Sequence, residues 1–356
     1  MKIGLIGCQN SGKTTIFNAL TRSEAQVTDF SNAKAEPNLA VIDVEDERVT
    51  RLSEMYQPRK TIYATVEFID FVGVAGGAEK QGAFSPELLQ LAKNTDALAL
   101  VVRNFSNEIM GAPGPLEDVA RVEEELVFSD LIVVENRLER IEWENKKGKK
   151  SNQTLAEEAL LGKIRGQLND NRPIRRMDLT EEEDKLLKGY QFLSRKPLMV
   201  VLNSEEENFG RNAEILARLQ ENHTVVEFAG NFEMELSRMT SDEDIQLFME
   251  DLGVEESARS LLTRTAYELL GYISFFTVGA DEVRAWTLRN GEPAVAAAGT
   301  IHSDLARGFI RAECFNYADL MACGSEKGVK EKGLLRLEGK EYRVKDGDIL
   351  NIRFNV

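Results

Sequence analysis

The sequence has no long hydrophobic run and few cysteines. No stretch of its 356 residues is long and apolar enough to span a bilayer, so we expect no membrane helix. The three cysteines, Cys8, Cys314 and Cys323, follow no disulfide or metal-binding spacing, which favours a reducing compartment. Segment 1–7 breaks into glycines after a short apolar run, unlike a secretory signal. We therefore expect a soluble cytoplasmic protein with no membrane partner, and a monomer.

The sequence also lacks an excess of basic residues. It has 44 Lys and Arg against 60 Asp and Glu, a net charge of −16. A protein that binds nucleic acid with its whole surface usually carries more Lys and Arg than this, because the phosphates must be neutralised. Any contact with RNA must therefore come from a local basic patch.

Length and patterning predict an α/β protein of several parts. The chain exceeds one ordinary domain, and its hydrophobic content of 42% is that of a globular protein. Apolar runs typical of buried strands alternate with helical patterns, which predicts a mostly parallel sheet covered on both faces. The expected strands are 2–7, 38–44, 62–70, 96–102, 197–203 and 223–228, and a helix is expected over 14–22.

Two other sequence patterns interrupt and follow this alternation of strands and helices. Between Pro115 and Pro197, apolar residues at helical spacing predict an antiparallel hairpin of helices over 118–145 and 153–168. Thr180 and Glu183 then form a capping-box pattern that predicts a third helix. After a helix over 257–270, short β-branched and aromatic runs predict a small β-rich domain, with tight turns at Glu338-Gly339 and Asp346-Gly347. Its expected strands are 273–278, 282–289, 310–315, 334–337, 341–344 and 349–354.

The clearest motif is the loop Gly7-Cys8-Gln9-Asn10-Ser11-Gly12-Lys13-Thr14. It has the form G-x-x-x-x-G-K-[ST] and lies between a predicted strand and a predicted helix, as a phosphate-binding loop must. The loop N–H groups and the helix N-terminus would surround the phosphates of ATP or GTP. Lys13 would reach the β- and γ-phosphates, and the Thr14 hydroxyl would bind Mg²⁺. The predicted nucleotide contacts here are Asn10, Ser11, Gly12, Lys13, Thr14 and Thr15.

A second motif, Asp70-Phe71-Val72-Gly73, follows a predicted strand and has the form D-x-x-G. It would place the Asp70 carboxylate near the Mg²⁺ and the Gly73 N–H near the γ-phosphate. The next residue, Val74, cannot orient the attacking water as a glutamine would. We therefore predict Thr14 and Asp70 as metal ligands, and Lys13 and Gly73 as catalytic residues.

A third motif, Asn203-Ser204-Glu205-Glu206, follows another predicted strand, where a guanine-specific site would have N-K-x-D. Ser204 stands in place of the lysine and Glu206 in place of the aspartate. The longer Glu206 need not end where an aspartate meets guanine, whereas the Asn203 amide can pair with either purine. We predict Asn203, Ser204 and Glu206 as base-binding residues, in a site that geometry alone does not make selective for GTP.

These segments resemble the YchF-type subfamily of Obg-related P-loop NTPases along essentially the whole chain. The resemblance extends to Glu36-Pro37-Asn38, to 66–70, and to C-terminal segments similar to the family's TGS domain, at 274–277, 282–287, 298–302, 307–313 and 353–356. It implies a P-loop NTPase parallel sheet, an inserted α-helical coiled-coil hairpin and a small C-terminal β-grasp-like TGS domain. It also implies an ATP-preferring NTPase that associates with ribosomes. We predict the nucleotide-binding domain over 1–116 and 196–272, the insertion over 117–195 and the TGS domain over 273–356.

The chain also departs from this family. Lys34 stands where the family usually has a switch threonine, and 107–114 contains no histidine where the family often has one implicated in hydrolysis. Related NTPases ligate potassium at the position of Asn10, so we predict Asn10 as a third catalytic residue that holds K⁺, with Lys34 as a rival source of positive charge. These departures leave open a nucleotide-binding scaffold with negligible hydrolysis. A metabolic P-loop kinase is disfavoured, because the C-terminal domain has no obvious role in phosphorylating a small substrate.

The predicted insertion is the least acidic part of the chain. Residues 118–195 contain 15 Lys and Arg and 17 Asp and Glu, a net charge of −2 out of −16. Cations concentrate in its tip Lys146-Lys147-Gly148-Lys149-Lys150 and in the turn Arg172-Pro173-Ile174-Arg175-Arg176. We hypothesise that they contact ribosomal RNA phosphates, against the alternative that they are simply solvated.

Overall fold

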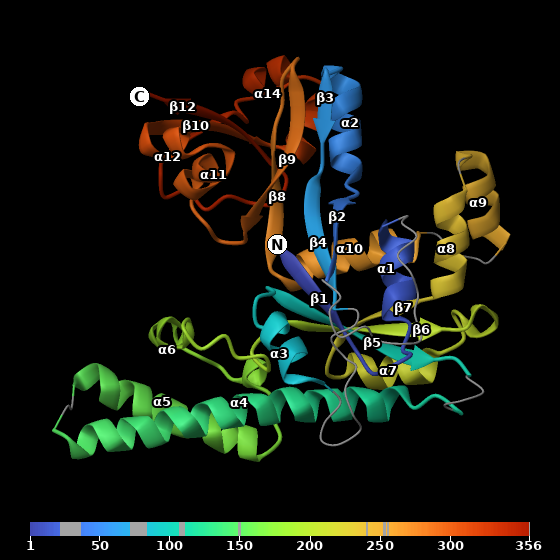
Figure 1. Ribbon diagram of the computed structural model, residues 1–356. Helices are drawn as coiled ribbons and strands as arrows, with labels where there is room; N and C mark the ends of the chain where they lie inside the picture. The colour runs from blue at the N-terminus through green and yellow to red at the C-terminus, as the bar shows by residue number, and fades with distance from the viewer. Residues whose placement is uncertain are drawn as a thin grey trace. The chain divides into compact units, whose positions relative to one another are not determined.

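The computed structural model describes residues 1–21, 37–71, 84–106, 111–148, 151–239, 241–251, 254 and 256–355. The chain divides into two compact units, which we describe one at a time (Figure 1). The first comprises Met1–Ala40 and Glu67–Arg259, and the second comprises Val41–Val66 and Ser260–Val356. Within the described ranges, no helix has the length and apolar character needed to cross a membrane.

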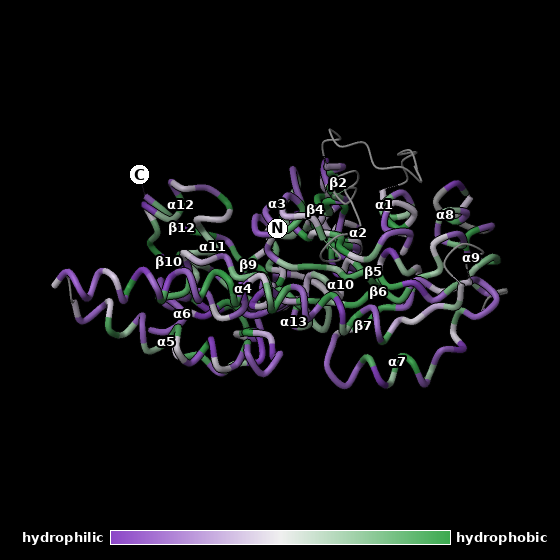
Figure 2. The backbone as a smooth tube through the Cα atoms, turned by 60° about the horizontal axis from the view of Figure 1, so that its bottom comes forward, coloured by the Kyte–Doolittle hydropathy of each residue, from purple (hydrophilic) through white to green (hydrophobic). Residues whose placement is uncertain are grey.

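The first unit is built on a parallel sheet. Within this sheet the neighbouring strands β4, β1, β5, β6 and β7 pair with one another in parallel, as the alternating sequence pattern predicts. Strands β5 and β6 are buried along their whole length, as central strands covered on both faces must be. Figure 2 shows both strands as mainly hydrophobic. In spatial order the strands are β2 (Asn38–Val44), β4 (Ala64–Asp70), β1 (Lys2–Ile6), β5 (Ala97–Asn104), β6 (Leu198–Ser204) and β7 (Thr224–Phe228).

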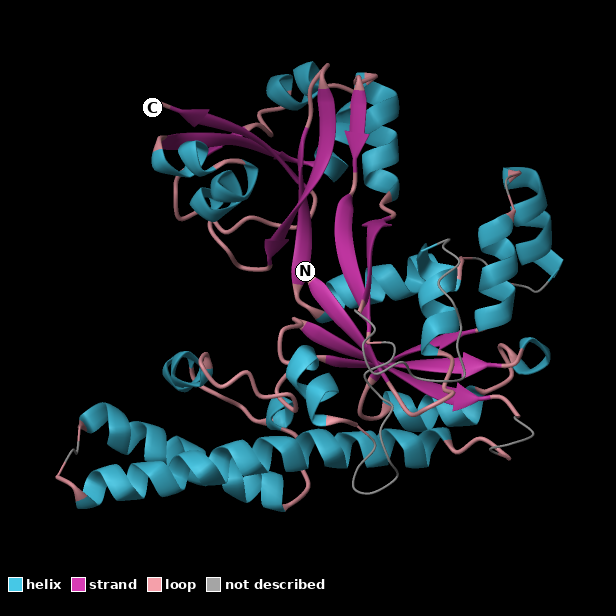
Figure 3. Ribbon diagram, viewed as in Figure 1, coloured by secondary structure: helices cyan, strands magenta, loops and turns pink. Residues whose placement is uncertain are grey.

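Helices cover both faces of this sheet (Figure 3). On one face, α3 (Pro86–Ala92), α4 (Pro115–Lys146) and α7 (Ala213–Gln220) share one hydrophobic cluster with β5 and β6. On the other face, α1 (Lys13–Thr21) contacts α8 (Gly230–Arg238). A short 3-10 turn η2 (Glu206–Asn208) follows β6, and α9 (Asp242–Asp251) follows α8.

The predicted helical hairpin is present between β5 and β6. Pro115 begins α4, since a first-turn proline gives up no intrahelical hydrogen bond. Helix α5 (Asn152–Asn169) packs against α4 through Val134, Ile141 and Ile164. A 3-10 turn η1 (Ile174–Arg176) and α6 (Glu181–Leu187) follow the hairpin before β6. Helix α6 has the predicted capping box of Thr180 and Glu183.

The second unit contains a mixed six-stranded sheet. Strands β8 and β9 are antiparallel, β8 and β12 are parallel, and β10 is antiparallel to both β12 and β11, which is the arrangement expected of a β-grasp-like domain. In spatial order the strands are β11 (Arg336–Glu338), β10 (Phe309–Asn316), β12 (Asp348–Phe354), β8 (Tyr272–Thr277), β9 (Glu282–Arg289) and β3 (Lys60–Ile62). The helices are α2 (Glu47–Tyr56), α10 (Ala258–Leu269), α11 (Ala294–Ile301), α12 (Ser303–Arg307), α13 (Tyr317–Cys323) and α14 (Glu326–Glu331).

One strand predicted in this unit is wrong. Residues 341–344 form no strand, and only Arg343 makes an isolated bridge, to Pro293. Their backbone bonds instead join the start of α11, since Ala294 N–H donates to Tyr342 C=O and Val344 N–H donates to Glu292 C=O. The turn at Glu338-Gly339 therefore does not connect two paired strands, and β11 and β12 both pair with β10.

Segment 41–66 belongs to the second unit by its contacts, whereas the sequence suggested a place in the nucleotide-binding domain. Strand β3 pairs in parallel with β9, from Lys60 with Glu282 to Ile62 with Arg284. Arg48 of α2 forms an ion pair with Asp346, and its guanidinium lies 5.1 Å from the centre of the Phe276 ring. Pairing with a strand more than two hundred residues away cannot be read from local pattern. The predicted domain boundaries stay a prediction.

A buried histidine lies where the helical hairpin meets the sheet of the first unit. The His223 side chain, just before β7, is only 6% exposed, and its Nε2 lies 3.6 Å from a Glu123 carboxylate oxygen. Arg175 and Arg176 of η1 both pair with Glu123. The pKa of His223 is lowered to about 4, because burial disfavours the imidazolium and the two arginines repel it.

This histidine predicts acid sensitivity. The unfolded chain takes up a proton on His223 near pH 6.5, whereas the folded chain does so only near pH 4, so folding stability falls as pH drops between these values. At pH 5 we expect a loss of about 2 kcal/mol relative to pH 7.5 from this group. Urea unfolding at both pH values should show that the His223→Gln variant loses about 2 kcal/mol less of its folding free energy than the parent protein. An equal loss in both proteins would contradict the assignment.

Candidate functional site

The loop between β1 and α1 has a backbone that few residues other than glycine permit. Gly7 has a φ of 151° and Gly12 a φ of 92°. A Cβ on Gly7 would lie 2.3 Å from the Val101 carbonyl oxygen, and one on Gly12 would lie 2.1 Å from Asn203 Nδ2. Asn10 also has a positive φ of 58°, a conformation in which asparagine is enriched. The backbone of the loop therefore requires glycine at positions 7 and 12, the two glycine positions of the motif.

Lys13 lies over this loop. Its Nζ donates to the Gly7 carbonyl at 3.0 Å and to the Cys8 carbonyl at 2.8 Å. Burial lowers the pKa of Lys13, and the nearby Asp70 carboxylate opposes this effect. The ammonium group is therefore held at the hollow of the loop, where a phosphate can compete with the loop carbonyls for it.

Thr14 and Asp70 meet beside the loop, as predicted for two ligands of one metal. The Thr14 hydroxyl donates to Asp70 Oδ2 at 3.1 Å. Asp70 is fully buried, and its Oδ1 has no hydrogen-bond partner among the described residues. Burial raises the pKa of this carboxyl to about 6, against the opposing effects of Lys13 and Thr14.

These two side chains fit Mg²⁺. A buried carboxylate oxygen without a partner is costly, and a hard cation would satisfy it. No group of three or more His, Cys, Asp or Glu that could hold a metal occurs within the described ranges. Two protein oxygens are the usual share for Mg²⁺ at a nucleotide site, because phosphates and water complete its octahedron.

Asn203 connects the end of β6 to the loop. Its Nδ2 donates to the Ser11 carbonyl at 3.0 Å, and its Oδ1 accepts from the Gly230 N–H at 3.3 Å. Gly230, the first residue of α8, lies so close to α1 that a Cβ on it would be 3.1 Å from Thr15 Cγ2. The structure therefore brings the predicted residues Ser11, Gly12, Thr15 and Asn203 together.

The other two predicted base-binding residues lie in different surroundings. The Ser204 side chain is buried, donates to Glu227 Oε1 at 2.7 Å and accepts from Asn104 Nδ2 at 3.0 Å, so its hydroxyl is already engaged within the protein. Glu206 is exposed at the start of η2. Its neighbour Glu205 instead accepts from the Ser106 N–H.

Sequence reasoning missed three polar residues at this edge of the sheet: Asn104, Glu205 and Glu227. Asn104 ends β5 and Glu227 lies near the end of β7, on either side of β6. Polar residues at the carboxyl ends of neighbouring parallel strands were the signal that could have identified them. Gly73, Val74, Lys34 and residues 107–110 lie outside the described ranges, as do Lys149 and Lys150.

Comparisons with known proteins agree along the whole chain. A family described as "50S ribosome-binding GTPase" matches residues 2–137, and a family named YchF-GTPase_C, described as a protein of unknown function, matches residues 272–355. The chain is 36% identical to the ribosome-binding ATPase YchF of Bacillus subtilis over 364 residues, which cover 99% of each protein. It is also 36% identical to the protein of that name from Escherichia coli O157:H7, over 100% of this chain and 99% of the relative.

A solved structure extends this similarity to three dimensions. The YchF GTPase of Schizosaccharomyces pombe superposes with a TM-score of 0.86 at 29% identity, covering 99% of this chain and 97% of the other. A match of this extent includes both the phosphate-loop sheet and the C-terminal mixed sheet.

Proposed function

The chain belongs to the YchF family of P-loop nucleotide hydrolases, and on this premise we propose that it is a ribosome-associated ATPase that acts as a switch. The observation that carries the proposal is the meeting of Lys13, Thr14 and Asp70 at a loop closed by Gly7 and Gly12. Relatives that match from end to end are named ribosome-binding ATPases.

Each residue of the site has a distinct task in this proposal. The loop N–H groups of 10–14 and the N-terminus of α1 bind the phosphates, and Lys13 neutralises the β- and γ-phosphates. Thr14 and Asp70 would hold Mg²⁺, which would neutralise the charge that develops on the phosphate oxygens. Thr15 would support the loop from α1, and the catalytic role proposed for Gly73, which lies outside the described residues, rests on the D-x-x-G motif alone.

We expect the base site to bind ATP at least as tightly as GTP. A guanine-specific aspartate rejects adenine because adenine would leave a buried carboxylate unpaired. Here Glu206 is exposed, so no buried carboxylate imposes this penalty. Since the Ser204 hydroxyl is already engaged by Glu227, Ser204 would touch the base only through its backbone. Asn203 keeps one amide hydrogen for either purine.

Titration with labelled ATP and GTP in Mg²⁺ tests this assignment. We expect ATP to bind at least as tightly as GTP, and Asn203→Ala to weaken both nucleotides, since the amide also holds the Ser11 carbonyl. Glu206→Ala is the matched variant and should change the ratio of the two affinities by less than about threefold. A GTP affinity tenfold above that of ATP, about 1.4 kcal/mol, would show that Glu206 does the work of the aspartate.

Hydrolysis must proceed without a glutamine after the D-x-x-G motif. A monovalent cation held by Asn10 would neutralise the charge that builds between the β- and γ-phosphates. The rival role of Asn10 is to supply the positive φ of 58° that shapes the loop. Lys34 offers another source of positive charge, and a scaffold that binds nucleotide with negligible turnover is the alternative that Val74 and Lys34 favour.

Steady-state ATP turnover in K⁺ and in Na⁺ separates these roles. We expect faster turnover in K⁺, and loss of that difference in Asn10→Gly, because glycine keeps the positive φ but has no amide oxygen. Retained K⁺ stimulation in Asn10→Gly would confine Asn10 to loop shape. Equal rates in both salts would exclude the cation, and no turnover in either would support the scaffold.

The ribosome contact that we propose is the tip of the α4–α5 hairpin. Of its described lysines, Lys146 pairs with Glu142 at 2.7 Å, and Lys147 Nζ lies 3.5 Å from the centre of the Trp143 ring. The arginine turn is a weaker candidate than its sequence suggests. Arg175 is 14% exposed and is engaged by Glu123.

Charge reversal at the tip tests this contact. Lys146→Glu with Lys147→Glu should weaken co-sedimentation with ribosomes and flatten its salt dependence, because fewer phosphates are neutralised. Lys185→Glu with Lys188→Glu is the matched control, since these exposed lysines carry the same charge, on α6 and at its C-cap. The same loss in both variants would mean a general charge effect, and unchanged binding at moderate salt would rule out the tip.

A further inference from the structure

In the second unit, β12 continues past the end of its neighbour β8. The two strands pair in parallel only where Ile349 lies opposite Phe276, and β8 ends at Thr277. Strand β12 runs on to Phe354 and stays paired with β10 along its other edge. Among the described strands none lies beside β12 on the β8 side after this point.

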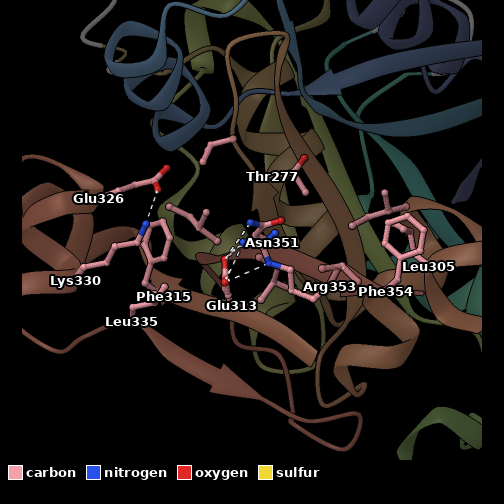
Figure 4. Close-up of a pocket in the computed structure, with 15 residues that line it drawn as sticks. Thr277, Leu305, Glu313, Phe315, Glu326, Lys330, Leu335, Asn351, Arg353 and Phe354 are labelled. Carbon is pink, nitrogen blue, oxygen red and sulfur yellow. Dashed lines mark hydrogen bonds and ion pairs between the residues drawn. The ribbon is translucent and has the colours of Figure 1, made fainter. Parts of the chain in front are cut away.

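A cavity of about 400 Å³ lies at this free edge (Figure 4). Residues 349–354 of β12 all line it, one after another. Successive side chains of a strand point to opposite faces, so a cavity lined by six consecutive residues must follow the edge of the strand. Side chains from both faces of the sheet agree with this placement: Leu305 of α12 on one face, and Glu313 and Phe315 of β10 on the other.

The backbone at this edge has unused hydrogen-bonding capacity. Asn355 donates its N–H to the Gly308 carbonyl, on the β10 side. Backbone groups alternate in direction along a strand, so those of Ile352 and the N–H of Phe354 point to the side that β8 has left. Such an unpaired edge is a template for another strand.

An arginine of β10 beside the cavity favours an acidic ligand. Arg311 lies directly opposite Arg353 in the β10–β12 register, and like charges so placed repel each other. The charged residues that line the cavity are paired with each other, Glu313 with Arg353 and Glu326 with Lys330. Arg311, beside the cavity, forms no ion pair with any described residue. A second carboxylate brought by a ligand would relieve the repulsion.

Figure 4 shows how the chemistry is distributed. Glu313, Asn351 and Arg353 lie in the middle, with Phe315, Leu335 and the Glu326–Lys330 pair at one end and Leu305 and Phe354 at the other. A small anion would use only the middle. An extended chain with alternating apolar and acidic residues would use the apolar ends, the arginines and the free backbone together, and four of its residues would span about 13 Å.

We propose that the free edge of β12, over residues 350–354, binds an extended acidic segment of a partner protein, which adds to the sheet as a strand where β8 ends. Backbone hydrogen bonds to Ile352 and Phe354 supply affinity. Acidic side chains meet Arg311 and Arg353, and apolar ones meet Leu305 and Phe354. RNA cannot pair with a strand edge in this way and would use only the arginines.

Fluorescence anisotropy with the full chain tests the proposal. The probe is a labelled eight-residue peptide of alternating valine and glutamate, and we expect micromolar binding. The same peptide N-methylated at alternate residues should bind at least tenfold more weakly, because it cannot pair along that edge. A peptide of alternating valine and lysine should also bind at least tenfold more weakly. No binding of the first peptide, or equal binding of the N-methylated one, would overturn the proposal.

A pair of variants isolates the backbone contribution. Phe354→Pro and Phe354→Ala both remove the half-exposed ring, but only proline removes the N–H. We expect Phe354→Pro to bind the peptide at least tenfold more weakly than Phe354→Ala, with both proteins folded by their amide NMR spectra. Equal affinities would exclude strand addition. A twelve-nucleotide single-stranded RNA that binds at Arg311 and Arg353 in place of the peptide would also sink it.

Discussion

The candidate site depends on one side chain, the amide of Asn203. Its two ends hold the Ser11 carbonyl and the Gly230 N–H, and so join the end of β6 to the phosphate loop and to the first turn of α8. Only a glycine at position 12 leaves room for that amide, since a Cβ there would lie 2.1 Å from Asn203 Nδ2. The loop is therefore shaped by a contact with a residue far along the chain as much as by its own glycines.

Local patterns predicted the elements of the sheet well because each buried strand carries its own hydrophobic signature. The phosphate loop was predictable for the same reason, since its glycines and Lys13 are consecutive in the sequence. The side chains that surround Ser204 and Arg175 could not be predicted from local sequence. Glu227 and Glu123, which engage them, come from other elements, and no local pattern reports which side chains the fold brings together. Residues 341–344 have strand-like composition, yet their backbone bonds join the start of α11.

The strand that carries Asp70 has an unusual path. Strand β4 begins at Ala64 in the second unit and ends at Asp70 in the first, so the predicted metal ligand lies four residues after segment 41–66. In that segment β3 pairs with β9, and α2 contacts β9. The contacts of Arg48 with Asp346 and of β3 with β9 anchor that segment. The second unit is thus made of two pieces of chain, and no single cut separates it from the first.

This path has a consequence for synthesis on the ribosome. Lys60 of β3 pairs opposite Glu282 of β9, so β3 leaves the exit tunnel long before its partner has been translated. At roughly 5–20 residues per second, the interval is on the order of ten to forty seconds. Throughout that time α2 and β3 lack the surface on which they pack, although strands on either side of them can already pair. The nascent chain must carry this early segment unfolded, and its short three-residue strand offers little edge for wrong partners.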